Sequence, residues 1–296
     1  MEARVTAALA DCRRVLDRSG STFSLAFRLL PRDQRDAMTA FYAFCREVDD
    51  AVDEAPDAAS ARVAIEEWRG RVAAIHGGAR VHGGAPVHPV VAALAWGAAR
   101  FGIRREHLDL VLDGVEADLR RDRYATFADL YDYCYRVASS VGLVCVTVLG
   151  DRSPEAFRYA ELAGIGVQMT NVIRDVGEDA GRGRVYLPAE DMEAFGVAES
   201  DVLGRRYTPA LQRLLRFEAR RARAFHEMAA GALPPRSRGR LFFAEALRET
   251  YLALLDRIEV DGFPVLDRKV SLPAAARVRI ALRRRLDPAS WRGGAA

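Results

Sequence analysis

Aspartates recur in two short clusters that lie far apart in the sequence. The first cluster contains Asp49 and Asp53, and the second contains Asp175 and Asp179. The members of each pair are four positions apart, so on an α-helix both carboxylates lie on one face. Like charges at this spacing destabilise a helix by roughly 0.2–0.5 kcal/mol per pair. A chain that carries two such pairs is expected to use them for binding, and Mg²⁺ bridged to a substrate phosphate is the natural ligand.

The first cluster continues a polar stripe that begins at Tyr42 and Arg46. The four residues from Tyr42 to Asp53 follow one another at spacings of four, three and four positions. Arg46 precedes the carboxylates by one turn, where its guanidinium is suited to a diphosphate that Mg²⁺ bridges to the aspartates. Taken alone, this cluster is more commonly explained as a solvated acidic helix end.

The second cluster is more specific because neutral oxygens accompany the charged ones. Gln168 and Asn171 precede Asp175 and Asp179 at spacings of three, four and four positions, and Arg174 is adjacent. Amide and carboxylate oxygens on one helix face can share a hard cation. Two carboxylate faces, each with a neighbouring arginine, indicate a protein that holds phosphate groups through metal ions.

Three glycines fall within the helical stretch that carries the second cluster. Gly164, Gly166 and Gly177 each destabilise a helix interior by roughly 1 kcal/mol relative to alanine. For the first two, close packing of another helix and room for a bulky apolar ligand are equally good interpretations. Gly177 lies inside the predicted metal motif itself.

The elements that must position these residues are helices. Helical periodicity runs through nearly the whole chain, and no stretch alternates convincingly like a β-strand. We expect Asp33 to cap the second helix and Ser153-Pro154-Glu155 to open the seventh. The pattern predicts helices over 2–18, 33–54, 58–75, 89–101, 105–119, 126–149, 152–180, 207–231, 238–260 and 273–286.

Composition limits the class of protein. The chain has 296 residues, half of them apolar, and a formal charge of +3, which gives no case for nucleic acid as a partner. None of the four cysteines forms a CxxC pair, which favours a reducing compartment and no zinc site. The longest mostly apolar run, 137–150, is too short to span a bilayer. We therefore expect a cytoplasmic protein with one all-α domain over residues 1–296.

The motifs around both clusters resemble those of the squalene and phytoene synthase family, which joins prenyl diphosphates head to head. The resemblance covers roughly residues 15–270 and keeps the order and intervals of the motifs. It rests on Ser19-Gly-Ser-Thr-Phe23, Leu29-Leu-Pro31, Tyr42-Ala-Phe-Cys-Arg-Glu-Val-Asp-Asp50, Tyr133-Cys-Tyr-Arg-Val-Ala138, Val141-Gly142, Gln168-Met-Thr-Asn-Val-Ile-Arg-Asp-Val-Gly-Glu-Asp179 and Gly183-Arg-Val-Tyr-Leu-Pro188.

This resemblance implies a single-domain isoprenoid synthase fold, in which helices surround a central apolar cavity. It also implies two or three Mg²⁺ ions, held by Asp49, Asp53, Asn171, Asp175 and Asp179. Tyr42 and Arg46 are implied as catalytic residues together with the four aspartates. The residues implied in substrate binding are Ser19, Ser21, Phe23, Phe27, Arg46, Tyr133, Gln168, Asn171, Arg174, Tyr251 and Arg268. Two departures, at Ser24 and at Ser139-Ser140, concern the shape of the cavity.

The implied reaction is the condensation of two farnesyl diphosphates to presqualene diphosphate by a prenyltransferase. Within the family, the segments Cys45–Asp50 and Asp175–Arg184 look most like those of bacterial presqualene diphosphate synthases that feed squalene and hopanoid synthesis. No NADPH is expected, because that reaction stops before a reductive step. The alternatives are a phytoene or dehydrosqualene synthase of carotenoid synthesis, a terpene cyclase, and a non-catalytic assembly or binding member of the family.

The C-terminal stretch from Ala275 to Arg285 is basic and amphipathic. It suits peripheral contact with an anionic membrane near a lipid product, although an ordinary surface helix is the commoner explanation. Downstream enzymes of the squalene pathway are candidate partners by the same resemblance.

Overall fold

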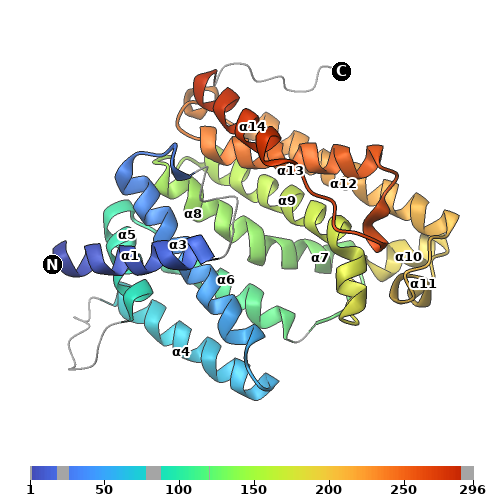
Figure 1. Ribbon diagram of the computed structural model, residues 1–296, viewed down its shortest axis with the longest axis horizontal. Helices are drawn as coiled ribbons and strands as arrows, with labels where there is room; N and C mark the ends of the chain where they lie inside the picture. Colours follow the sequence, from blue (N-terminus) through green and yellow to red (C-terminus); the bar gives the residue numbers. More distant parts are fainter. Residues whose placement is uncertain (1, 19–26, 78–87, 120, 288–296) are drawn as a thin grey trace. The chain divides into compact units, whose positions relative to one another are not determined.

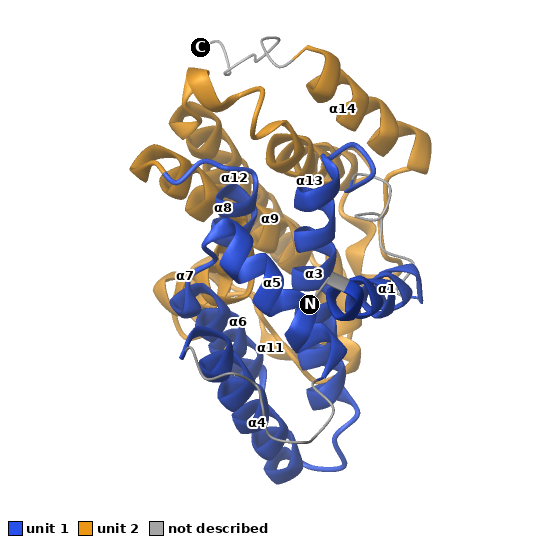
Figure 2. Cartoon of the chain, turned by 90° about the vertical axis from the view of Figure 1, so that its left-hand side faces the viewer, with its two compact units in different colours: residues 1–119, 143–152 blue, residues 120–142, 153–296 orange. Residues whose placement is uncertain are grey.

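A computed structural model describes residues 2–18, 27–77, 88–119 and 121–287, and its regular elements are helices (Figure 1). Within these residues the only β-structure is an isolated parallel bridge between Arg123 and Val185. The chain forms two compact units, which Figure 2 colours separately. Unit 1 comprises residues 1–119 and 143–152, and unit 2 comprises residues 120–142 and 153–296. The extent of a single domain over 1–296 stays a prediction.

Unit 1 is built around α3 (Arg32–Asp53). This helix packs against α1 (Glu2–Arg18), α4 (Ala58–His76), α5 (Pro89–Phe101) and α6 (Arg105–Asp118). Its buried face includes Phe41, Phe44 and Val48, none more than 1% exposed. The opposite flank of α3 is left for polar residues, and that flank carries the first aspartate cluster.

Unit 2 is built around the long helix α9 (Pro154–Gly181). This helix packs against α12 (Pro209–Ala232), α13 (Phe242–Val260), the π-helix η1 (Tyr135–Ser139) and the 3₁₀-helix η3 (Pro264–Leu266). The remaining elements are α7 (Phe127–Cys134), α10 (Ala189–Phe195), α11 (Glu199–Leu203), η2 (Pro235–Ser237) and α14 (Ala274–Leu286). Because α9 packs against several other helices of unit 2, its position is fixed along much of its length.

Side-chain caps explain where several helices begin. The hydroxyl of Ser153 accepts a hydrogen bond from the Ala156 amide at 3.3 Å, and Pro154 occupies the first turn of α9, as predicted. Thr208 caps α12 in the same way through the Leu211 amide at 3.1 Å. The prediction for Asp33 was wrong. The N-cap of α3 is Pro31, and Asp33 instead lies in the first turn. There its negative charge interacts favourably with the positive end of the helix dipole.

The predicted helix boundaries agree with the structure except around residues 126–149. That stretch divides into α7, η1 and α8 (Ser140–Val148), because the π-turn inserts an extra residue into the helical ladder. Ser139 in the π-turn approaches α9 closely, and its hydroxyl donates to the Glu161 carbonyl at 2.7 Å. The short helices α10 and α11 were missed, because seven or five residues show too little periodicity.

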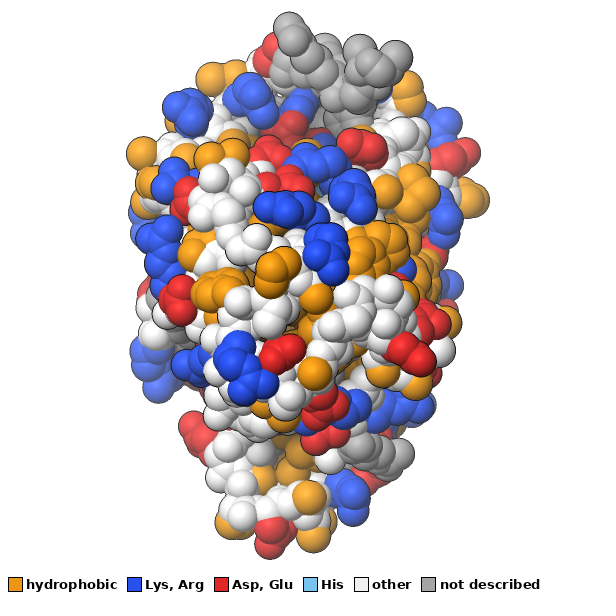
Figure 3. All heavy atoms as spheres, turned by 90° about the vertical axis from the view of Figure 1, so that its right-hand side faces the viewer, with side chains coloured by type: hydrophobic (Ala, Val, Ile, Leu, Met, Phe, Trp, Pro, Cys, Tyr) orange, Lys and Arg blue, Asp and Glu red, His pale blue; other side chains and the backbone are white. Residues whose placement is uncertain are grey.

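Charged side chains of both signs are intermixed with apolar ones on the face shown in Figure 3. None of the four cysteines is in a disulfide. Among the described residues, no helix is long and apolar enough to cross a membrane.

Candidate active site

The first cluster lies along one flank of α3, in unit 1. Tyr42, Arg46, Asp49 and Asp53 follow one another on this helix, as the spacing predicts. Arg46, Asp49 and Asp53 are exposed, whereas Tyr42 is half-buried. The helix therefore presents a guanidinium and two carboxylates to an incoming ligand.

Arg46 is held by Asp50, a residue that the sequence analysis did not assign to the site. Its Nη2 lies 2.6 Å from Asp50 Oδ1, and its Nε donates to Asp50 Oδ2 at 3.1 Å. This two-point contact restricts the guanidinium to the neighbourhood of the cluster. The spacing of four residues between Arg46 and Asp50 could have indicated the pair in advance.

Asp49 is a carboxyl of the first cluster whose pKa is raised. Desolvation by the surrounding protein raises the pKa of this carboxyl to about 7, and the like charge of Asp53 adds to the effect. Arg46 opposes the shift. Part of the Asp49 side chain remains exposed, so solvent screens its interaction with the neighbouring charges. A carboxylate in this setting gains from a cation that neutralises it.

A hollow of about 490 Å³ opens on the neighbouring flank of α3. It is lined by the described residues Val15, Arg18, Arg46, Glu47, Asp50, Ala51, Glu54, Trp68, Arg71 and His88. Several of the lining residues contact one another. His88 Nε2 lies 3.2 Å from Glu47 Oε2, and the Arg71 guanidinium lies 4.7 Å from the Trp68 ring centroid.

The second cluster lies on one face of α9, in unit 2. Asn171 donates from Nδ2 to Gln168 Oε1 at 3.2 Å, which fixes which side of the amide carries the oxygen. Asn171 Oδ1 is buried and has no hydrogen-bond partner among the described residues. An unsatisfied buried oxygen costs about 1–3 kcal/mol. This oxygen is therefore a good candidate ligand for a hard cation.

Asp175 is surrounded by cations. Arg174 makes a two-point contact with it, with Nε–Oδ1 and Nη2–Oδ2 distances of 2.8 Å and 2.5 Å. Arg174 also interacts with Tyr251 on α13, a residue that the family resemblance implies in substrate binding. Asn171, Arg174, Asp175 and Tyr251 are therefore brought together within unit 2.

Lys269 was missed by the sequence analysis as a site residue. It follows η3, and its Nζ lies 3.3 Å from Asp175 Oδ1 and 2.9 Å from Glu178 Oε2. Lys269 is the only lysine in the chain. That rarity was visible in the sequence, but nothing in the spacing linked residue 269 to residue 175.

Gly177 allows the segment that carries Lys269 to approach α9. A Cβ atom at this position would lie 2.5 Å from the Val265 carbonyl oxygen and 2.7 Å from Leu266 Cα, so only glycine fits. The other two glycines also serve packing. Cβ atoms at Gly164 and Gly166 would lie 2.5 Å from Ser139 Cα and 3.1 Å from the His226 ring. Of the two interpretations of these glycines, the structure supports close packing.

Asp179 is half-buried at the far end of the second cluster. Desolvation raises the pKa of its carboxyl to about 6, and the charges of Asp175 and Glu178 add to the shift. Arg182 and Arg184 oppose it. Like Asp49, Asp179 is a carboxyl whose ionised form would be stabilised by a bound cation.

Three tyrosine rings form a buried cluster in unit 2. Tyr133 packs against Tyr124 and Tyr186, with ring centroids 5.3 Å and 5.4 Å away, and the latter two rings are 5.5 Å apart. The family resemblance implies Tyr133 in substrate binding, whereas Tyr124 and Tyr186 were not assigned. The negative faces of such rings can stabilise a carbocation if they line its cavity.

The other sequence-predicted residues have different surroundings. Phe27 is buried, at 2% exposure. Arg268 is exposed and forms an ion pair with Asp261 at 3.1 Å, so its predicted contact with diphosphate stays a prediction. Ser19, Ser21 and Phe23 lie outside the described residues.

The donor set fits magnesium that arrives together with a diphosphate. Among the described residues, no group of three or more His, Cys, Asp or Glu side chains is arranged to hold a metal by itself. Mg²⁺ commonly takes one or two carboxylates and completes its octahedron with water and substrate phosphate. The paired aspartates on α3 and the Asn171–Asp175 face on α9 provide that number of oxygen ligands.

Comparisons with known proteins identify the family to which this chain is similar. A family model described as "Squalene/phytoene synthase" matches residues 16–276. A phytoene synthase of Arthrospira platensis is 34% identical over 278 residues, which cover 88% of this chain and 87% of that protein.

Two solved structures share the fold. A dehydrosqualene synthase in complex with ligand has a TM-score of 0.82 and 26% identity, with 95% of this chain and 96% of that chain covered. The squalene synthase HpnC from Alicyclobacillus acidocaldarius has a TM-score of 0.78 and 28% identity, with 88% and 96% covered. The predicted all-α fold of isoprenoid synthases is confirmed.

Proposed function

We propose a reaction on the premise that this chain belongs to the squalene/phytoene synthase family. The proposed reaction is the condensation of two farnesyl diphosphates to presqualene diphosphate. The observation that carries the proposal is the pair of carboxylate faces on α3 and α9. Each face has an arginine fixed beside it by an acidic residue. A diphosphate offers many oxygens to such groups, and the prenyl chain attached to it is apolar, as expected for a substrate of an isoprenoid synthase.

The reaction requires a diphosphate to leave before carbon atoms join. Ionisation of one substrate breaks its C1–O bond and gives an allylic cation and free diphosphate. The C2–C3 double bond of the second substrate attacks C1 of the cation, and loss of one proton closes the cyclopropane. One C30 diphosphate, one free diphosphate and one proton result. Bound Mg²⁺ supplies Lewis-acid stabilisation of the departing diphosphate.

The residues of the chain contribute to charge stabilisation at both clusters. Arg46 and Arg174 are each oriented by a hydrogen bond to a neighbouring carboxylate. From these positions they would donate to diphosphate oxygens, which matters most as negative charge develops on the leaving group. Lys269 adds a second cation beside Asp175. Tyr42, half-buried on α3, is a candidate for accepting the proton.

The choice of farnesyl diphosphate rests on the likeness of the Cys45–Asp50 and Asp175–Arg184 segments to bacterial presqualene diphosphate synthases. HpnC, a squalene synthase, supports the same choice through its shared fold. A second candidate is the production of phytoene or dehydrosqualene, since the relative from Arthrospira platensis is a phytoene synthase and one structural neighbour is a dehydrosqualene synthase. Both candidates share the first condensation.

The deciding experiment is a product assay by mass spectrometry, with farnesyl diphosphate and Mg²⁺ and without NADPH. We expect a C30 cyclopropyl diphosphate, no product in EDTA, and recovery when Mg²⁺ is restored. Dehydrosqualene as the product would favour the carotenoid branch. Phytoene from geranylgeranyl diphosphate alone would show that the substrate is longer. No turnover with either substrate would favour a non-catalytic family member.

A further inference from the structure

Helix α9 carries the predicted metal ligands on one face and is anchored by the other. At about 100° per residue, Tyr159, Gly166 and Thr170 share one side of α9, which lies about 100–180° around the helix from Asn171 and Asp175. Tyr159 and Thr170 are 1% and 0% exposed. These two side chains are therefore buried away from solvent. Both are polar, and they make hydrogen bonds that join α9 to its neighbours.

The first anchor joins α9 to α12 through Thr170 and His226. The Thr170 hydroxyl donates to the Gly166 carbonyl at 2.8 Å, and His226 Nε2 lies 3.1 Å from the same hydroxyl oxygen. A neutral imidazole that is protonated on Nε2 can donate to this hydroxyl oxygen. The His226 ring also packs directly on Gly166, where a Cβ atom would lie 3.1 Å from it.

His226 remains neutral in this place. Desolvation is the largest cause of a shift that lowers the pKa of the imidazole to about 3, and the charges of Arg248 and Arg223 contribute to that shift. Its Nδ1 is buried and has no hydrogen-bond partner among the described residues. The contact of the ring with Thr170 is therefore made through Nε2.

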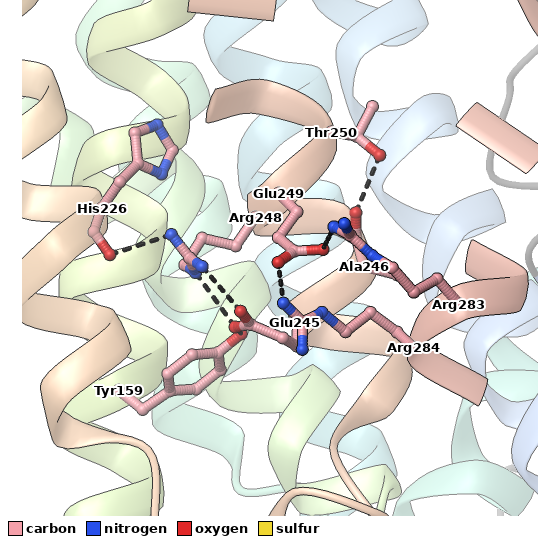
Figure 4. A network of polar contacts seen from close by, with 9 residues as sticks. All are labelled: Tyr159, His226, Glu245, Ala246, Arg248, Glu249, Thr250, Arg283 and Arg284. Carbon is pink, nitrogen blue, oxygen red and sulfur yellow. Dashed lines mark hydrogen bonds and ion pairs between the residues drawn. The ribbon is translucent and has the colours of Figure 1, made fainter. Parts of the chain in front are cut away.

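The second anchor joins α9 to α13, as Figure 4 shows. Arg248 donates to Glu245 at 2.6 Å and 3.0 Å, and Glu245 accepts from the Tyr159 hydroxyl at 3.1 Å. Arg248 also donates to the His226 carbonyl at 3.0 Å, so the two anchors are connected. We call Tyr159, Thr170, His226, Glu245 and Arg248 the back-face network.

A buried ion pair is weak evidence for stability, because desolvation offsets much of its attraction. Such pairs can instead specify one arrangement, because their hydrogen bonds are directional. Here the hydrogen bonds fix both the rotation of α9 about its axis and its position along that axis. An apolar interface would permit small slips at little cost in burial.

Such slips matter most for Asn171, because no described side chain holds its oxygen in place. Asn171 directly follows Thr170 in the chain, and its Oδ1 has no hydrogen-bond partner among the described residues. The oxygen therefore takes its position mainly from the helix backbone and the Gln168 contact. Any rotation at Thr170 is transmitted to Asn171.

We propose that the back-face network consists of positioning residues, which hold Asn171 and Asp175 in register for binding a metal–diphosphate complex. This inference rests on the proposed function. It predicts that the Thr170 hydroxyl affects metal affinity although it lies at least about 100° around α9 from the ligands.

The test measures binding without turnover. Binding of Mn²⁺ in the presence of inorganic diphosphate is followed by electron paramagnetic resonance for the wild-type protein and for Thr170→Val and Thr170→Ser. Valine keeps the shape of threonine and loses the hydroxyl, whereas serine keeps the hydroxyl and loses a methyl group. We expect Thr170→Val to weaken binding about tenfold, the lower end of the effect of orienting partners at metal sites, and Thr170→Ser to stay close to wild type.

Thr147→Val is the matched control. Thr147 is also buried, at 2% exposure, and its hydroxyl donates to the Leu143 carbonyl four residues earlier at 2.8 Å. This substitution removes the same kind of hydrogen bond from unit 1, so it should leave Mn²⁺ binding unchanged. Tyr159→Phe should weaken binding in the same direction as Thr170→Val, and it keeps the inference testable if Thr170→Val fails to fold.

The outcomes separate the two proposals. No binding of Mn²⁺ with diphosphate to the wild-type protein would overturn the proposed metal site, and the inference would fall with it. Binding to wild type with equal affinity in Thr170→Val or Tyr159→Phe would overturn the positioning role alone. Weaker binding in Thr170→Ser than in Thr170→Val would show that packing at Thr170, rather than the hydroxyl, controls the site.

Discussion

Among single residues, Lys269 illustrates how a site residue can escape a search by spacing. The resemblance to family motifs directs attention to Arg268, whose guanidinium forms an ion pair with Asp261. The adjacent lysine is the cation that contacts Asp175 and Glu178. Neighbouring residues outside a helix can point in quite different directions, so Arg268 and Lys269 contact different acidic partners although they are adjacent in the sequence.

Replacement of these two cations should therefore have unequal effects. We expect Lys269→Met to lower kcat/KM for the prenyl diphosphate at least about tenfold, because a charge next to a phosphate site contributes roughly 1.5–3 kcal/mol. Arg268→Met serves as the control and should change it less than about threefold. Steady-state kinetics at saturating Mg²⁺ measures both. A larger loss of kcat/KM in Arg268→Met than in Lys269→Met would show that Arg268, and not Lys269, contacts the diphosphate.

His226 gives a prediction about stability and pH. The unfolded chain takes up a proton on this imidazole below pH 6.5, whereas the folded protein does so only near pH 3. The contribution of His226 is therefore fully present above pH 6.5 and is lost as the pH falls toward 3. Between pH 6.5 and 5 the loss should be about 2 kcal/mol.

Urea unfolding at pH 7 and pH 5, for wild type and His226→Gln, isolates this contribution from other titrating groups. The variant should lose less stability than wild type on acidification. An equal loss in both proteins would show that His226 is protonated, or solvated, in the folded state.

At the scale of elements, the glycines of α9 decide how closely its neighbours approach. Gly177→Ala should destabilise the protein by about 1–3 kcal/mol, because the new Cβ meets the backbone of η3 at 2.5 Å. Gly70 in α4 is the control, since no described atom lies within 4 Å of a Cβ there. Gly70→Ala should stabilise by about 0.5–1 kcal/mol. Chemical denaturation compares them, and a neutral Gly177→Ala would mean that η3 can withdraw from α9.

Helix α14 carries the predicted membrane contact. Part of its positive charge is used within unit 2, because both Arg283 and Arg284 form ion pairs with Glu249. The exposed side retains Arg279 together with Leu282 and Leu286, at 43% and 80% exposure. Basic and apolar residues on one exposed face suit an anionic bilayer surface.

Pelleting with liposomes that contain anionic lipid should therefore bring down the protein at low salt and less of it at high salt. Arg279→Glu should reduce the pelleted fraction severalfold, because it reverses a charge on the exposed side. Arg62→Glu, on the exposed side of α4, is the matched charge control. Absence of pelleting at low salt would remove the membrane role.

For the whole molecule, each unit supplies one carboxylate cluster, and the proposed reaction needs both. Mg²⁺ with inorganic diphosphate should stabilise the folded protein, by about 2.7 kcal/mol at one hundred times the dissociation constant. Thermal unfolding with and without EDTA measures this effect.

Asp49→Ala and Asp175→Ala should each reduce turnover by at least about 100-fold, the loss typical when one preorganised charge-stabilising group is removed. Circular dichroism should show that both variants keep their helices. Near wild-type turnover in either variant would show that its cluster does not serve the reaction.

The sequence by itself determined the elements and the surface that each presents. Apolar periodicity defined ten helices, and nine of them appear within a few residues of the expected bounds. The spacing of Asp49 with Asp53 and of Asn171 with Asp175 placed each cluster on one helical face. These features are local, because the pitch of a helix fixes which side chains share a face.

Only the tertiary structure decided what surrounds those faces. The contact of Lys269 with Asp175, the packing of η3 on Gly177 and the link from Thr170 through His226 to Arg248 join residues distant in the chain. The π-turn at Tyr135–Ser139 also depends on α9, which offers Gly164 for close approach. Such contacts follow from the packing of helices against one another, which no single periodic pattern encodes.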